Sequence, residues 1–161
     1  MTIAVGADHN GFALKELVKA HLMSRGFEVT DYGTNGTDPV DYPDVALAVA
    51  QAVAEQRHDR AVLVCGTGIG MAIVANKVPG VRAAAVQDPY SAERARKSND
   101  AQVLCLGGQV IGPEVALILV DHWLDAEFAG GRSASKVAKI NMLDKEYRIT
   151  RHEGPDVLRR P

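Results

Sequence analysis

Short continuous apolar runs alternate along the chain with longer segments in which apolar residues recur every three or four positions. Continuous runs are typical of strands buried on both faces, whereas the longer spacing is typical of amphipathic helices. The runs predict strands at 2–7, 60–65, 81–86 and 102–107, and the segment 27–33 is predicted as a further strand. The helical spacing predicts helices at 11–26, 43–56, 89–97, 113–128 and 133–148, with a further amphipathic segment that ends near residue 77.

This alternation predicts a single-domain doubly wound α/β fold, in which a five-stranded parallel sheet lies between helices. The domain is expected to span residues 1–148. The segment 149–161 has little apolar periodicity, and we expect a tail there, either a disordered end or an arm over a neighbouring subunit. Ligands of such folds bind beyond the carboxyl ends of the strands, so the residues that follow each strand are the first candidates for a site.

A glycine-rich turn follows the third strand and opens a helix. Gly66, Gly68 and Gly70 form a GxGxG pattern, whose unpaired backbone N–H groups are expected to stabilise an anion. Cys65 lies beside this positive pole, which favours a thiolate that acts as a base or nucleophile. The alternative is a small buried hydrophobe. Dinucleotide binding also stays open, although the spacing differs from GxGxxG.

Further candidates lie after the first strand and at the start of the last helix. Asp8 and His9 follow the first strand, where they could bind a ligand or serve as a helix cap and a solvated histidine. Arg132 and Lys136 are four residues apart and therefore share a helix face. Two cations on one face suit a phosphate, although such pairs are usually solvated.

Charge and composition narrow the range of partners. The chain has 161 residues, with 18 basic and 20 acidic side chains, which gives no reason to expect nucleic acid or a membrane surface as partner. Cys65 and Cys105 each lie within an apolar run, so we expect no disulfide and a cytoplasmic location, with Cys105 in the core. The five histidines lack the spacing of metal sites, and neither a metal nor a cofactor is predicted.

Six segments occur in an order that resembles ribose-5-phosphate isomerase type B, in the wider family that includes galactose-6-phosphate isomerase. The resemblance runs from residue 1 to about residue 148. It rests on the segments 6–15, 41–44, 65–84, 89–100, 106–112 and 130–137. The resemblance implies a metal-free aldose–ketose isomerase of short sugar phosphates. Ribose 5-phosphate and ribulose 5-phosphate are the first candidate pair of substrate and product. It also implies a homodimer or homotetramer in which two subunits share each site.

The resemblance also implies roles for individual residues. Cys65 would remove the proton next to the carbonyl, and Thr67 would relay a proton between O1 and O2 of the cis-enediolate. The turn from Gly66 to Gly70 would form the oxyanion hole. The positions implied to contact the substrate are Asp8, His9, Gly66, Gly68, Ile69, Gly70, Ser98, Asn99, Gln109, Arg132 and Lys136.

Departures from the family pattern point to a second substrate. Ser98 stands where the family usually has a ring-opening histidine, and Gln109 stands where it has a phosphate-binding arginine. Ser133 and Lys136 replace a histidine and an arginine. Erythrose 4-phosphate cannot close a furanose ring, so the alternative is an isomerase of erythrose 4-phosphate and erythrulose 4-phosphate. An alternative of another class is a non-catalytic module that binds a phosphorylated metabolite.

Overall fold

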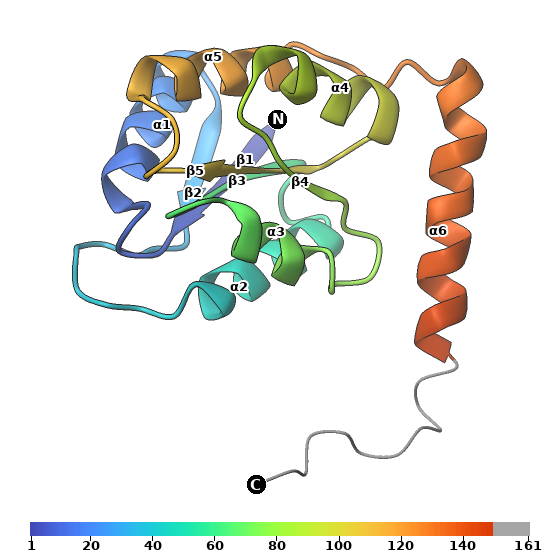
Figure 1. Ribbon diagram of the computed structural model, residues 1–161, viewed down its shortest axis with the longest axis horizontal. Helices are drawn as coiled ribbons and strands as arrows, with labels where there is room; N and C mark the ends of the chain where they lie inside the picture. Colours follow the sequence, from blue (N-terminus) through green and yellow to red (C-terminus); the bar gives the residue numbers. More distant parts are fainter. Residues whose placement is uncertain (150–161) are drawn as a thin grey trace, which may run out of the picture.

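The computed structural model describes residues 1–149, with side chains described through residue 147, and confirms the predicted α/β fold (Figure 1). Five parallel strands form one sheet in the order β2-β1-β3-β5-β4. The strands are β1 (Thr2–Ala7), β2 (Glu28–Asp31), β3 (Arg60–Cys65), β4 (Ala83–Ala85) and β5 (Val103–Gly107). The helices are α1 (Phe12–Ser24), α2 (Tyr42–Ala54), α3 (Ile69–Ala75), α4 (Pro89–Asn99), α5 (Pro113–Leu124), α6 (Ala134–Ile149) and the 3-10 helix η1 (Gly131–Ser133).

Helices cover both faces of the sheet, as Figure 1 shows. On one face α1, α4 and α5 bury alternate strand residues such as Val62 and Leu104. On the other face α2 and α3 bury the remaining strand residues, which include Leu63 and both cysteines. Cys105 is fully buried there as expected, and burial raises the pKa of its thiol, with a further contribution from nearby Cys65. None of the helices within residues 1–149 is long and apolar enough to cross a membrane.

Helix α6 stands apart from the two layers (Figure 1). It is tied to the segment before β4, where the Arg82 guanidinium donates to Asn141 Oδ1 over 3.0 Å. The predicted tail at 149–161 lies outside the described residues except for Ile149, which ends α6.

The prediction that the fifth helix extends to residue 128 is wrong, because α5 ends at Leu124. The cause is Arg60, whose side chain is buried beneath the end of this helix. Its guanidinium donates to the carbonyl oxygens of Trp123 (3.0 Å), Leu124 (2.9 Å) and Ala126 (3.2 Å). These carbonyls would otherwise lack partners at a helix C-terminus. The chain therefore leaves the helix one turn early.

Gly11 lets α1 begin directly against β3. A Cβ atom built on Gly11 would lie 2.2 Å from the carbonyl oxygen of Val64, which is part of the backbone and cannot move aside. We expect Gly11→Ala to lower the free energy of unfolding by about 3 kcal/mol or more. Gly36→Ala is the matched control, since nothing lies within 4 Å of the added Cβ. Urea unfolding of the two variants compares them, and equal midpoints would contradict this packing.

Candidate functional site

The loops that follow three neighbouring strands lie at one edge of the sheet. Strands β1, β3 and β5 are adjacent and parallel, and Cys65 is paired in register with Gly107. Asp8 and His9 follow β1, the glycine turn follows β3, and Gln109 follows β5. The structure therefore brings these predicted residues together at the carboxyl edge of the sheet, where α/β folds bind their ligands.

The sulfur of Cys65 points into the glycine turn. Its Sγ accepts a hydrogen bond from the N–H of Gly68 over 3.1 Å, and the residue is 5% exposed. Gly68 has a φ of 77°, the left-handed conformation that glycine adopts without strain. The Cys65 carbonyl accepts from the N–H of Gly108 over 2.8 Å, which fixes the end of β3 against the loop after β5. The turn thus holds the sulfur in one place.

Several amides of the same turn stay available to a ligand. The N–H groups of Gly66, Thr67, Gly70 and Met71 donate to no acceptor within residues 1–149. The N–H of Ile69 lies 3.4 Å from Thr67 Oγ1, which is a weak contact. Unpaired N–H groups beside a sulfur form a pocket suited to an oxyanion. The N–H of Gly68 is not available to a ligand, because it already donates to the Cys65 sulfur.

Asp8 supports the turn that starts α1. The side chain is 4% exposed, and its Oδ1 accepts from the N–H of Gly11 over 2.9 Å. This bond closes the turn before α1, whose N-cap is Gly11 and has no side-chain cap, so Asp8 does not cap the helix itself.

His9 belongs to a row of polar groups that crosses the candidate site. Its Nδ1 accepts from the N–H of Val40 over 3.3 Å, and its Nε2 lies 3.2 Å from Asn10 Nδ2. Asn10 Oδ1 accepts in turn from Gln109 Nε2 over 3.1 Å. The Gln109 carboxamide covers Gly66, because its Oε1 lies 2.8 Å from the position of an added Cβ. Asn10 and Val40 were not among the predicted residues, although Asn10 directly follows Asp8 and His9 in the sequence.

A buried lysine anchors the loop that carries Val40. Lys15 is fully buried, and its Nζ donates to both oxygens of Asp31 (2.8 and 2.7 Å) and to the Thr34 carbonyl (2.8 Å). Burial by itself would raise the pKa of Asp31, but the hydrogen bonds from Lys15 and Lys19 outweigh it and hold that pKa below its usual value. The loop after β2 is therefore fixed to α1 before it reaches His9.

The remaining predicted residues lie at the opposite edge of the sheet. Ser98 and Asn99 end α4, and the Asn99 carbonyl accepts from Nε of Arg82, the residue just before β4 (3.1 Å). Arg132 and Lys136 follow in η1 and α6, and both are exposed. A strand of five or six residues spans about 17–20 Å, so one chain does not bring these four residues to Cys65. The predicted site is divided into two groups.

The carboxyl edge lacks cations of its own. Its five loops are residues 8–11, 32–41, 66–68, 86–88 and 108–112. They contain no lysine or arginine, and their charged side chains are Asp8, Asp38, Asp41 and Asp88. A phosphate at this edge would meet amides and His9 but no permanent positive charge.

Comparison with known proteins gives one consistent family. The family described as "Ribose/Galactose Isomerase" matches residues 3–140. A D-erythrulose-4-phosphate isomerase of Pectobacterium atrosepticum is 52% identical over 148 residues, which cover 91% of this chain and 97% of that protein. A solved structure of Clostridium thermocellum ribose-5-phosphate isomerase B is 50% identical, with a TM-score of 0.90 over 91% of this chain and 99% of that one. Mycoplasma genitalium ribose-5-phosphate isomerase B with bound ribulose-5-phosphate is 39% identical, with a TM-score of 0.87 over 90% and 97%.

Proposed function

Because the chain belongs to the ribose/galactose isomerase family, we propose that it is an aldose–ketose isomerase of short sugar phosphates. Ribose 5-phosphate and ribulose 5-phosphate are the first candidate pair of substrate and product. Relatives that are 49% and 46% identical to the chain are ribose-5-phosphate isomerases, and a related structure at 39% identity contains bound ribulose-5-phosphate. The observation that supports the chemistry is the Cys65 sulfur held beside unpaired amides.

The proposed mechanism uses the sulfur as base and the turn as oxyanion hole. The Cys65 thiolate removes the proton from C2 of the aldose, and the electron pair forms the C1–C2 double bond of an enediolate. The amides of the turn hold the oxygen that gains charge, and each well-placed donor contributes about 3–4 kcal/mol. Thr67 relays the proton between O2 and O1, and the thiol returns its proton to C1. General base catalysis of this kind contributes about 10²–10⁴-fold.

We also propose that each site is completed by a second copy of the chain. The phosphate needs cations that the carboxyl edge lacks, and Arg132 and Lys136 are exposed cations that lie elsewhere on the chain. Ser98 and Asn99 would approach the substrate from the same copy. Helix α6 supports this arrangement, because Ile140, Met142 and Leu143 are 44%, 67% and 43% exposed. A homodimer or homotetramer would cover these apolar side chains.

The tetrose pair is the second candidate. Ser98 supplies no imidazole for ring opening, and a relative at 52% identity is a D-erythrulose-4-phosphate isomerase. Erythrose 4-phosphate needs no ring opening because its O4 carries the phosphate. The cytoplasmic location expected from the two cysteines stays a prediction.

Turnover of the two aldose phosphates tests the choice of substrate. We expect isomerisation of both, measured as kcat/KM on ribose 5-phosphate and on erythrose 4-phosphate. A tenfold or greater preference, about 1.4 kcal/mol in transition-state binding, assigns the substrate. Solvent deuterium should enter the carbon next to the carbonyl in either case, because the thiol proton exchanges with solvent in a fraction of turnovers before it reaches C1. A chain that binds these sugars with neither isomerisation nor exchange is a binding module, and the proposed enzyme function is then wrong.

A further inference from the structure

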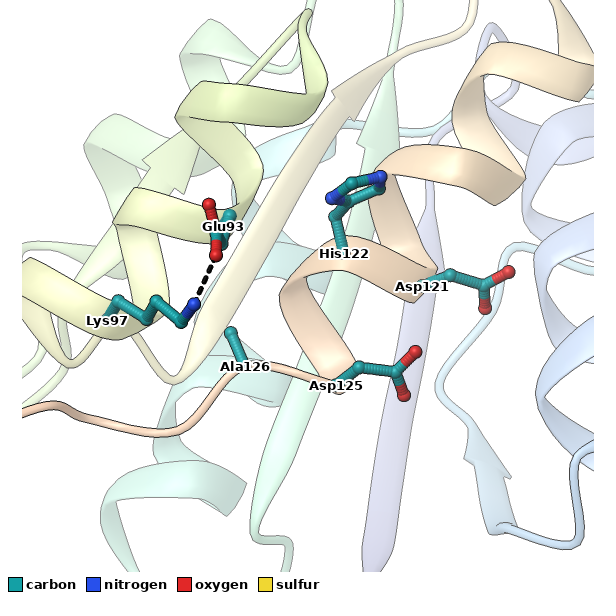
Figure 2. A pocket seen from close by; sticks show the side chains of 6 residues that line it. All are labelled: Glu93, Lys97, Asp121, His122, Asp125 and Ala126. Carbon is teal, nitrogen blue, oxygen red and sulfur yellow. Dashed lines mark hydrogen bonds and ion pairs between the residues drawn. The ribbon is translucent and has the colours of Figure 1, made fainter.

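A guanidinium and a hydroxyl form a pair on the flank of α4 that faces away from α5. Arg94 Nη2 donates to Oγ of Ser98, four residues later, and both side chains are half-buried. The neighbouring pair, Glu93 and Lys97, lines a pocket on the α5 side, together with His122 (Figure 2). Successive helix residues are turned by roughly 100°, so Arg94 and Ser98 face toward the open edge of the sheet beside β4.

Arg94 makes no ion pair with a carboxylate of the described residues, although the Glu93 carboxylate lies near enough to interact with its charge. Ion pairs with carboxylates neutralise Arg25, Arg57, Arg82 and Arg96. Arg60 is buried against the carbonyls that end α5. Within residues 1–147, Arg94 and Arg132 are the two remaining arginines, and neither has a carboxylate oxygen within 4.0 Å of its guanidinium nitrogens. The acidic neighbour Glu93 is paired with Lys97 instead.

The pair presents hydrogen-bond donors outward. Ser98 Oγ accepts from Arg94, and its own proton is donated to no acceptor within residues 1–149. Arg94 has further N–H groups that its contact with Ser98 leaves unused. Free N–H and O–H donors beside one positive charge match a ligand that offers acceptors and negative charge, such as a phosphate.

We propose that Arg94, together with Ser98, binds the phosphate of the substrate held beside Cys65 of the partner subunit. The inference rests on the proposed function and on the shared site. It gives the phosphate a guanidinium in a chain whose carboxyl edge has only the neutral Gln109 and no lysine or arginine. Arg94 then acts beside Arg132, the other arginine without a carboxylate partner.

Replacement of Arg94 by glutamine tests this role. We expect Arg94→Gln to raise KM for the sugar phosphate by about 10- to 100-fold, the range of one charge-assisted hydrogen bond, with kcat within about threefold. The inhibition constant of inorganic phosphate should rise by a similar factor. Arg94→Lys should recover part of the loss. Lys97→Gln is the matched control, since it removes one cation from the same helix on the α5 side.

Three outcomes would overturn the proposal. One is a KM and a phosphate inhibition constant that match those of Lys97→Gln. Another is a fall in kcat and melting temperature with KM unchanged, which would make Arg94 a structural residue. If the unaltered chain shows no isomerisation at all, the proposed function fails separately, and calorimetric titration with inorganic phosphate then decides the role of Arg94. Equal phosphate affinity of the unaltered chain and Arg94→Gln would reject it.

Discussion

Cys65→Ala is expected to lower kcat by about 10²–10⁴-fold, because the variant keeps the amides of the turn but loses the proposed base. Alanine keeps the Cβ atom of this almost fully buried side chain and removes only the sulfur, which also leaves the N–H of Gly68 without its acceptor. The measurement is the rate of ribose 5-phosphate isomerisation together with the rate of deuterium uptake from solvent. Both rates should fall by the same factor.

Cys105→Ala is the control for this experiment. Cys105 is fully buried on the same face of the sheet, and its pKa is raised by burial, so it is not suited to act as a base. We expect its loss to cost some stability and to leave kcat within about threefold, because it only empties a small volume of core. A Cys65→Ala variant that turns over as fast as Cys105→Ala would remove the thiol from the mechanism.

Two inactive variants should restore activity when they are combined. In the proposed dimer, Cys65 and the cations of Arg132 and Lys136 reach each site from different subunits. A heterodimer of Cys65→Ala with the double variant Arg132→Ala, Lys136→Ala therefore has one site with all lesions and one intact site. Random pairing of equal amounts makes half of the dimers mixed, so about a quarter of the parental activity should return. The variants must be co-expressed or refolded together to exchange subunits.

The control for this pairing combines two lesions from the same group. Cys65→Ala and Thr67→Ala both lie at the carboxyl edge, so every site in their heterodimer carries one lesion. Its activity should equal the mean of the two separate variants. If the first mixture also gives only the mean, the sites are not shared between subunits in the proposed way, and the division of residues between the two sheet edges needs another explanation.

The fold could be predicted because the strands other than β2 lie in continuous apolar runs, as in RAVLVC at 60–65. The end of α5 could not be predicted from local pattern, since the apolar spacing continues past Leu124. What ends the helix is Arg60, which lies more than 60 positions earlier in the chain and contacts its last carbonyls. Local propensity carries no information about such a distant cap.

The candidate site was predictable where it consists of residues directly after strands. Cys65 and the glycine turn are of this kind. His9 and Gln109 were also predicted, but the row of contacts that joins them through Asn10 was not, because it uses loops that are far apart in the sequence. The contact of His9 with the N–H of Val40 was not predictable for the same reason. The division of the site residues into two groups follows from the direction of α4. This helix begins at the carboxyl edge of the sheet and runs back toward the amino edge, so its last residue, Asn99, lies far from the loop that precedes the helix.

The lack of lysine and arginine in the loops of the carboxyl edge has a consequence for how the protein would work in dilute solution. Under the proposed arrangement, the carboxyl edge of a single protomer carries aspartates and does not bind an anionic sugar. Its Cys65 thiol therefore has no substrate to act on. Turnover then requires an encounter between two chains before any encounter with substrate. At low abundance the rate would rise with the square of protein concentration, so expression level would itself act as a threshold for activity.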